Sequence, residues 1–159
     1  MDVHVPRSYR SRSRAPDLIA FRIAIAETDL HIQVAAGTPE EAGELKSLAA
    51  DTARAARRAI EAEILLRPQF SSSLAPIQPR NGAPPVVLAM YAAGIAAGVG
   101  PMAAVAGAIA EAVGRKLLER VPEVIVENGG DLFLSRSRQR TVAVYAGRSP
   151  LSNRIGLVL

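Results

Sequence analysis

The sequence has no cysteine and no tryptophan, and aromatic residues make up only 4% of its 159 residues. Without cysteine there can be no disulfide framework, no thiolate metal site and no cysteine nucleophile. The two histidines, His4 and His31, lie far apart in the sequence, which argues against a zinc site built on histidine and cysteine. Since 49% of the residues are hydrophobic, the chain can bury a core of alanine, valine, isoleucine and leucine in one domain.

The formal net charge is +4, and much of the excess lies near the N-terminus. The arginines there are Arg7, Arg10, Arg12 and Arg14. A basic arm of this kind could contact nucleic acid. Apart from Tyr9, however, no aromatic residues are interleaved with the arginines, and no nucleic-acid-binding motif follows them. We therefore interpret residues 1–16 as a poorly ordered, solvated arm and expect no nucleic-acid partner.

One long stretch, Ala83 to Ala110, carries no charged residue and is long enough to cross a membrane. It is rich in alanine and glycine, and Gly98-Val99-Gly100-Pro101 interrupts it. This composition favours two buried helices joined by a tight corner. No secretory signal peptide is visible at the N-terminus. We therefore expect a cytoplasmic protein that has no membrane partner.

Hydrophobic periodicity predicts the order of the elements. The pattern gives strands over 19–26 and 30–34, an amphipathic helix from Pro39 to just before Pro68, helices over 85–97 and 101–119, and strands over 124–127, 132–135, 141–145 and 154–159. Strands at both ends with helices between them indicate an α+β fold. We predict a single domain over residues 17–159, and because the chain stops inside the apolar strand 154–159 we expect it to be truncated at the C-terminus. We also predict a turn at Glu27–Asp29, an exposed His31 and arginines on the solvated face of the first helix.

Residues 67–85 form a long connection without an obvious structure of its own. Connections of this length in compact domains are often functional. The loop offers the hydroxyl groups of Ser71, Ser72 and Ser73, and Arg80 could face an anion. Because no histidine or carboxylate is near these serines in the sequence, a catalytic serine is only weakly indicated.

Two segments suggest a small-molecule site. Gly100-Pro101-Met102-Ala103 begins a helix, with proline at the favoured first position, and free amide groups at a helix start bind anions. Asn128-Gly129-Gly130-Asp131 predicts a tight hairpin turn whose central residues need positive φ. Many folds use both features without any ligand, so a purely structural role remains the alternative for each segment.

At these two segments the sequence resembles the uncharacterised ApbE-like family, which is related to the FAD:protein FMN transferase ApbE. The matching residues run along most of the chain. They are Tyr9-Arg10, Glu27–Leu30, Pro68, Phe70, Ser73-Leu74, Pro76, Ala83-Pro84, Met90, Gly100–Glu111, Glu127–Asp131, Tyr145–Gly147 and Ser149. The resemblance implies a T-fold-like ApbE architecture, an antiparallel sheet packed against paired Ala/Gly-rich helices.

The resemblance also implies a ligand. In ApbE, FAD lies over the glycine-rich region, and Mg²⁺ assists the transfer of FMN to a threonine of a target protein. By this resemblance Gly100, Pro101, Met102, Ala103, Ser73, Asn128, Gly129, Gly130 and Asp131 are the candidate cofactor-binding residues. ApbE has a Gly–Lys motif where this chain has Pro101 and Met102, and the family's usual Mg²⁺ ligands correspond to positions beyond Leu159.

Three hypotheses stay open. The first is an enzyme related to FMN or nucleotidyl transfer, with Asp131 or Glu127 supplying charge to a metal or acting as a base. This chain would carry only part of that activity. The second is a non-catalytic ligand-binding or accessory protein, for example in sulfur assimilation, which the missing lysine favours. The third is a structural half whose final strand seeks a partner edge, which predicts a homo-oligomer.

Overall fold

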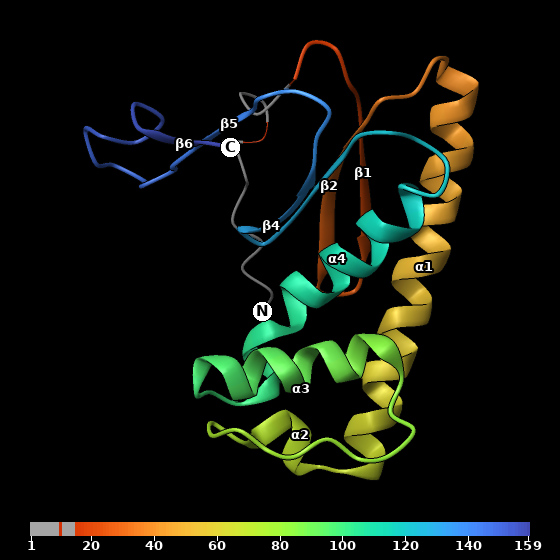
Figure 1. The fold of residues 1–159 in the computed structure, drawn as a ribbon, viewed down its shortest axis with the longest axis vertical. Coiled ribbons are helices and arrows are strands. Elements are labelled where there is room, and N and C mark those ends of the chain that lie inside the picture. The colour runs from red at the N-terminus through yellow and green to blue at the C-terminus, as the bar shows by residue number, and fades with distance from the viewer. Residues whose placement is uncertain (1–9, 11–14) are drawn as a thin grey trace.

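The computed structural model describes Arg10 and residues 15–159, and it contains an antiparallel sheet with helices packed against it (Figure 1). Four strands pair in the order β1-β2-β3-β4. They are β1 (Ile19–Ile25), β2 (Thr28–Val34), β3 (Val124–Asn128) and β4 (Asp131–Ser135). Sheet and helices together confirm the predicted α+β class. The finer T-fold assignment stays a prediction.

The long helix α1 (Pro39–Leu66) begins as its sequence predicts. Thr38 caps it, because the Thr38 Oγ1 accepts a hydrogen bond of 3.2 Å from the Glu41 amide. The Glu41 carboxylate in turn accepts a 2.6 Å hydrogen bond from the Gly37 amide. The buried face of α1 is mostly alanine, leucine and isoleucine, and it contacts β1 and the later helix α4 (Val105–Leu117).

The apolar Ala83–Ala110 stretch forms the predicted pair of helices, joined by a corner. Helix α3 (Pro85–Ala97) ends at Gly98, whose φ of 71° is the left-handed conformation that favours glycine. The 3-10 turn η2 (Pro101–Ala104) then leads directly into α4. Within the described residues no single helix meets the length and hydropathy of a membrane span; α3 and 101–117 meet them only together, across a bend of 110°.

Three local predictions are wrong. The turn expected at Glu27–Asp29 is a shorter turn, because Thr28 already pairs with Ile25 and only Ala26 and Glu27 connect the strands. A two-residue turn fits the twist of the hairpin better, and Ala26 takes a positive φ of 48° to form it. His31 is half-buried, not exposed, because its strand lies between β1 and β3.

The third error concerns the solvated face of α1. Arg57 does not extend into water: its side chain is 19% exposed, and its guanidinium contacts the Glu27 carboxylate at 2.8 Å. It also donates a 3.0 Å hydrogen bond to the Thr28 hydroxyl. Arg57 therefore ties the β1–β2 turn to α1. The remainder of the predicted face is as expected, since Arg54 and Arg58 are exposed.

The long loop contains a short helix that the sequence did not indicate, α2 (Gln69–Ser72). Phe70 is fully buried and packs edge-on against Tyr91 of α3, with ring centroids 5.0 Å apart. This aromatic contact fixes α2 beneath α3 at the lower end of the molecule in Figure 1.

The last two strands form a separate hairpin, β5 (Thr141–Ala143) with β6 (Gly156–Val158). It projects away from the main sheet in Figure 1. Both strands are shorter than the sequence predicts. The proposed boundary at residue 16 stays a prediction, and Arg7, Arg12 and Arg14 lie outside the described residues. For Arg10 the prediction of a solvated arm is wrong, because its side chain is only 10% exposed and pairs with Asp29 and Glu127.

Candidate functional site

Gly100 lies at the corner between α3 and η2, against the loop that carries Ser73. Its amide donates a 3.0 Å hydrogen bond to the Leu74 carbonyl. A Cβ atom on Gly100 would lie 1.7 Å from the Ser73 carbonyl oxygen, so no other residue fits there without moving the backbone. The structure thus brings Gly100 and Ser73 together, and close backbone packing explains the glycine.

The other residues of the predicted helix start differ in their access to solvent. Pro101 is buried, Met102 is half-buried and Ala103 is exposed. Among the described residues no side chain caps η2 or the following α4. Two amides at this helix start already have backbone partners: the Ala103 amide donates a 3.2 Å hydrogen bond to the Gly100 carbonyl, and the Gly100 amide donates to the Leu74 carbonyl.

The predicted turn between β3 and β4 is a two-residue turn centred on Gly129 and Gly130. Their φ values are 65° and 111°, which L-residues with side chains rarely adopt. The flanking Asn128 and Asp131 pair with each other in the ladder. The prediction of positive φ at both central residues is confirmed, although the centre is Gly-Gly, not Asn-Gly.

The turn lies against the first turn of α4. The Asn128 amide group donates a 3.0 Å hydrogen bond to the Ala106 carbonyl. The Asp131 carboxylate is next to Gly107, where an added Cβ would be 3.8 Å from the Asp131 Oδ2. Two segments more than twenty residues apart in the sequence are thus in contact, and Asp131 is exposed beside the positive end of a helix.

The Glu127 carboxylate holds the turn through a hydrogen bond to its backbone. Its Oε1 accepts a 3.0 Å hydrogen bond from the Gly130 amide. Its Oε2 accepts a 2.5 Å hydrogen bond from the Arg10 Nε, and the Glu127 side chain is only 13% exposed. Glu127 therefore has a structural part in holding Gly130, while the exposed Asp131 has the accessible carboxylate.

Arg10 joins this turn to the neighbouring β1–β2 hairpin. Its Nη1 lies 2.9 Å from the Asp29 Oδ1, and Arg22 contacts the same oxygen at 2.7 Å. Burial raises the pKa of Asp29, but the hydrogen bonds from Arg22 and Arg10 outweigh burial and lower that pKa to about 2. No local pattern indicates this cluster, since Arg10 and Glu127 are 117 positions apart in the sequence.

A second buried carboxylate, Glu63, holds the 67–85 loop. It is fully buried near the end of α1, and its Oε1 accepts a 2.8 Å hydrogen bond from the Tyr91 hydroxyl. Its Oε2 accepts a 2.7 Å hydrogen bond from Arg80. The anion that Arg80 faces is therefore a carboxylate of its own chain. Burial and, to a smaller extent, the hydrogen bond to Glu63 raise the pKa of Tyr91.

No metal site is formed by the part of the chain that the structure describes, since no three histidine, aspartate or glutamate side chains gather there. Asp131 alone does not make the oxygen cage that Mg²⁺ prefers. A small hollow of about 80 Å³ lies elsewhere, between the start of α1 and Arg120. It is too small for a nucleotide, whose sites measure about 300–1,000 Å³. Backbone amides are hydrogen-bond donors and suit a phosphate better than a metal, but the Gly130 and Ala103 amides already donate to the Glu127 Oε1 and to the Gly100 carbonyl.

We compared the chain with models of known protein families. A family model described as AbpE bacteria matches residues 10–158. The chain belongs to this family. The match begins at Arg10 and includes the helix start, the glycine turn and the projecting hairpin.

The chain is similar to proteins of Methanococcus and Methanopyrus species. The chain is 38% identical over 140 residues to a UPF0280 protein of Methanococcus aeolicus, a match that covers 87% of this chain and 54% of the relative. It is 37% identical over 140 residues to a UPF0280 protein of Methanopyrus kandleri, with the same coverage of 87% and 54%. The chain therefore spans about half the length of these relatives.

Proposed function

We propose that this chain binds a phosphorylated small molecule, with a flavin nucleotide as the first candidate, between the 128–131 turn and the start of the 101–117 helix. The observation that carries the proposal is the contact of Asn128 and Asp131 with the first turn of α4. It places the exposed Gly129-Gly130 backbone beside the first turn of α4.

The chemistry of these groups suits a nucleotide. Backbone amides at a helix start and in a glycine turn bind phosphate oxygens through hydrogen bonds and the helix dipole. Asp131 would repel a phosphate at short range, so we assign it to the sugar or ribityl hydroxyl groups, which donate hydrogen bonds to a carboxylate. Glu127 would hold Gly130 in place next to the ligand.

Binding without transfer is the favoured form of this proposal. The helix start has Pro101, Met102 and Ala103 where the ApbE transferase has lysine, and residues 83–110 carry no charged side chain. A non-catalytic ligand-binding or accessory protein is thus the leading candidate. FMN transfer with FAD and Mg²⁺ is the second candidate, and it would require groups that the described residues do not supply.

The test is thermal unfolding with FAD, FMN and ATP, each with and without Mg²⁺. A ligand present at about 100 times its dissociation constant should stabilise the folded state by about 2.7 kcal/mol. We expect a shift with a flavin nucleotide that Asp131→Ala reduces and that Asp51→Ala, on the exposed face of α1, leaves unchanged.

Two results would contradict the proposal: no shift with any of the three compounds, or equal shifts in the wild type and the Asp131→Ala variant. Release of AMP from FAD in the presence of Mg²⁺ distinguishes the two candidates. Its absence together with binding supports the accessory protein, and its presence supports the transferase.

A further inference from the structure

The Gly129-Gly130 turn has no side chains of its own to pack, so polar contacts from its neighbours fix its geometry. Gly130 has a φ of 111°, and a Cβ added there would have no described atom within 4 Å apart from those of its chain neighbours. The side chains of Asn128 and Glu127 flank the turn from β3. They lie on opposite faces of the sheet, because successive residues of a strand point to opposite sides.

Each of these two side chains holds the turn in its own way. On the face that α4 covers, Asn128 donates its hydrogen bond to the Ala106 carbonyl. On the other face, the Glu127 Oε1 accepts a 3.0 Å hydrogen bond from the Gly130 amide. A glutamate side chain has several rotatable bonds, so the position of its Oε1 depends on what holds the carboxylate.

Arg10 holds that carboxylate. Its Nε donates a 2.5 Å hydrogen bond to the Glu127 Oε2, which is not the oxygen that contacts Gly130. Its Nη2 donates a 2.7 Å hydrogen bond to the Asp29 carbonyl, and its Nη1 lies 2.9 Å from the Asp29 Oδ1. One planar guanidinium thus contacts acceptors on two neighbouring strands, and its side chain is only 10% exposed. A buried fork of this kind fixes the plane of the Glu127 carboxylate.

We propose that Arg10 is a positioning residue for the ligand site. It fixes the Glu127 carboxylate, the carboxylate fixes the Gly130 amide, and the turn keeps the geometry that the ligand meets. Arg10 acts through Glu127 and does not itself bind the ligand. The effect on affinity rests on the proposed function, whereas the effect on the turn does not.

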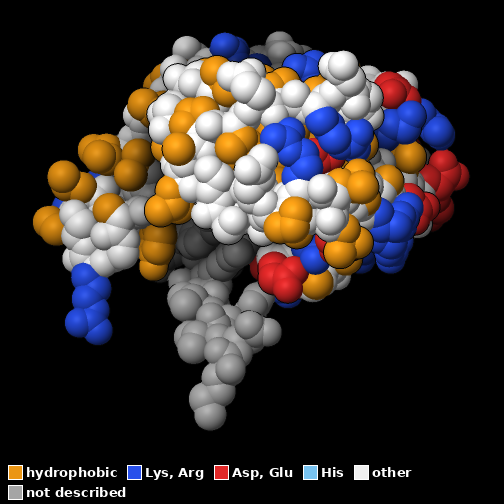
Figure 2. All heavy atoms as spheres, turned by 90° about the horizontal axis from the view of Figure 1, so that it is seen from below, with side chains coloured by type: hydrophobic (Ala, Val, Ile, Leu, Met, Phe, Trp, Pro, Cys, Tyr) orange, Lys and Arg blue, Asp and Glu red, His pale blue; other side chains and the backbone are white. Residues whose placement is uncertain are grey.

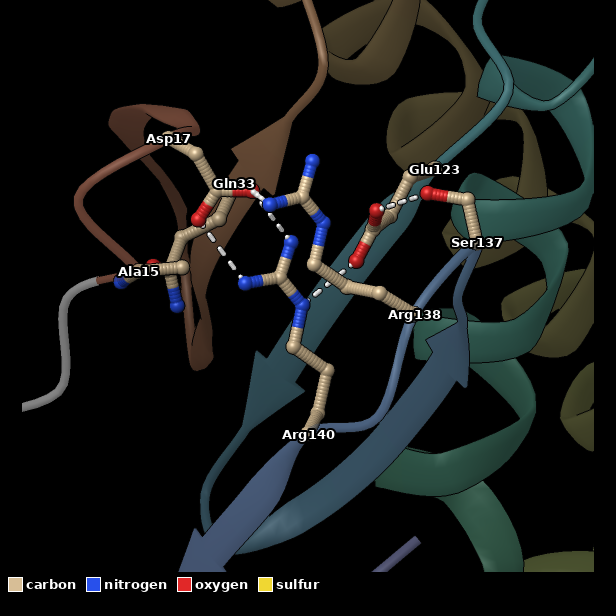
Figure 3. A network of polar contacts seen from close by, with 7 residues as sticks. All are labelled: Ala15, Asp17, Gln33, Glu123, Ser137, Arg138 and Arg140. Carbon is tan, nitrogen blue, oxygen red and sulfur yellow. Dashed lines mark hydrogen bonds and ion pairs between the residues drawn. The ribbon is translucent and has the colours of Figure 1, made fainter.

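A second arginine provides a matched control. The Arg140 Nε donates a 2.6 Å hydrogen bond to the Glu123 Oε1, and its two Nη atoms donate to the Asp17 carboxylate at 2.8 and 2.7 Å (Figure 3). Its side chain is 12% exposed, close to the value for Arg10. Each arginine therefore joins two acidic residues, and replacing either one removes similar contacts.

The two arginines act at opposite ends of β3. Glu123 comes directly before this strand, whereas the turn follows it. Arg140 leads into residues 141–159, which we call the C-terminal hairpin. This hairpin projects from the main body, with hydrophobic side chains gathered on it (Figures 1 and 2). Loss of Arg140 should therefore loosen the base of the C-terminal hairpin and leave the 128–131 turn held.

The experiment uses the full ¹⁵N-labelled chain and the variants Arg10→Gln, Arg10→Lys, Glu127→Ala and Arg140→Gln. For each we measure the rate at which the Gly130 amide exchanges with water, by NMR, and the dissociation constants of FMN and FAD. The double variant Arg10→Gln with Glu127→Ala shows whether Arg10 acts through Glu127. Urea denaturation of every variant identifies a general loss of stability.

In Arg10→Gln we expect about tenfold faster exchange at Gly130 and about tenfold weaker flavin binding, because a hydrogen bond to a charged group is lost. Arg10→Lys keeps a charge for Glu127 and should restore both quantities to within about threefold of the wild type. Arg140→Gln should change both by less than about twofold, because it is distant from the turn. The double variant should bind flavin as Glu127→Ala does.

Several results would overturn the proposal. They are unchanged Gly130 exchange or unchanged flavin affinity in Arg10→Gln, equal changes in Arg10→Gln and Arg140→Gln, and a further loss of affinity when Arg10→Gln is added to Glu127→Ala. If the wild type binds neither flavin, the proposed function fails separately. The exchange rate of Gly130 in the variants then decides whether Arg10 holds the turn.

Discussion

The two hairpins that follow α4 have the same antiparallel pairing but opposite surroundings. In β3–β4, Val124 and Val126 are fully buried, and Phe133 packs against Gly114 of α4. In the C-terminal hairpin, Leu157 and Val158 are each about 60% exposed. A helix packs against the first hairpin and fixes its glycine turn, whereas only the base of the second is anchored.

The different surroundings of the two hairpins bear on the proposed ligand site. A turn that contributes to a ligand site must be held in one geometry, and the β3–β4 turn is held by Asn128 and Glu127. The C-terminal hairpin, residues 141–159, has instead an anchored base and exposed apolar side chains. The two hairpins therefore differ in their surroundings and not in their antiparallel pairing.

We expect the largest effect from a substitution that disrupts the packing of β3–β4 against α4. In Gly114→Ala the new Cβ would lie 2.0 Å from the Phe133 ring, so the ring or the helix must move. We expect a loss of about 3 kcal/mol in the free energy of unfolding, measured by urea denaturation.

The matched control is Gly43→Ala. This glycine is exposed on α1, and no atom of the described residues outside its own helix turn lies within 4 Å of its added Cβ. Alanine should therefore stabilise the helix by about 1 kcal/mol. Changes of the same sign in both variants would contradict the packing argument.

A smaller effect concerns the ion pairs that connect the hairpins to the N-terminal segment. The pKa of Asp29 in the folded protein is about 2, below its ordinary value of 3.8. Because the folded-state pKa is lowered, this stabilisation is present above about pH 4 and is lost as the pH falls toward 2. The loss should be at most about 2.4 kcal/mol, because each pKa unit corresponds to about 1.36 kcal/mol.

The measurement is the urea midpoint between pH 5 and pH 2. The Asp29→Asn variant should be less stable than the wild type at pH 5. Its urea midpoint should fall less steeply than that of the wild type between pH 5 and pH 2. The pKa of Asp17 is also lowered to about 2, by its hydrogen bond with Arg140, so part of the slope should remain. An unchanged slope in Asp29→Asn would contradict the role of this carboxylate.

The smallest expected effect is in the C-terminal hairpin. Leu157→Asp replaces a side chain that is 61% exposed, so the free energy of unfolding of the isolated chain should change by less than about 0.5 kcal/mol. Thermal unfolding checks this. A loss of more than about 2 kcal/mol would mean that the hairpin packs against the domain in solution, and would remove the contrast between the two hairpins.

Much of the fold follows from local patterns in the sequence. The alternation in Ile19–Ile25, the cap at Thr38 and the proline at position 101 each place an element correctly, because these signals act over a few residues. The Gly129-Gly130 turn follows for the same reason. The short helix α2 has no strong cap or period, and it depends on burial of Phe70 beneath α3.

The contacts between distant segments could not be predicted in this way. Nothing near Glu127 in the sequence shows that Arg10 would reach it, and nothing near Glu63 points to Tyr91 or Arg80. The sequence identified both halves of the candidate ligand site, yet it did not show that Asn128 would contact Ala106. These pairings arise from packing of the whole domain, which no local pattern encodes.

The most direct test of the ligand site is a titration of the ¹⁵N-labelled chain with FMN and with FAD, followed by amide chemical shifts. The account predicts saturable shifts at Ala103, Gly107, Gly129 and Gly130, with Gly147 in the C-terminal hairpin unchanged. Saturable shifts centred on Leu45 and Arg120, around the small hollow, would contradict it, and so would the absence of saturable shifts with both flavins.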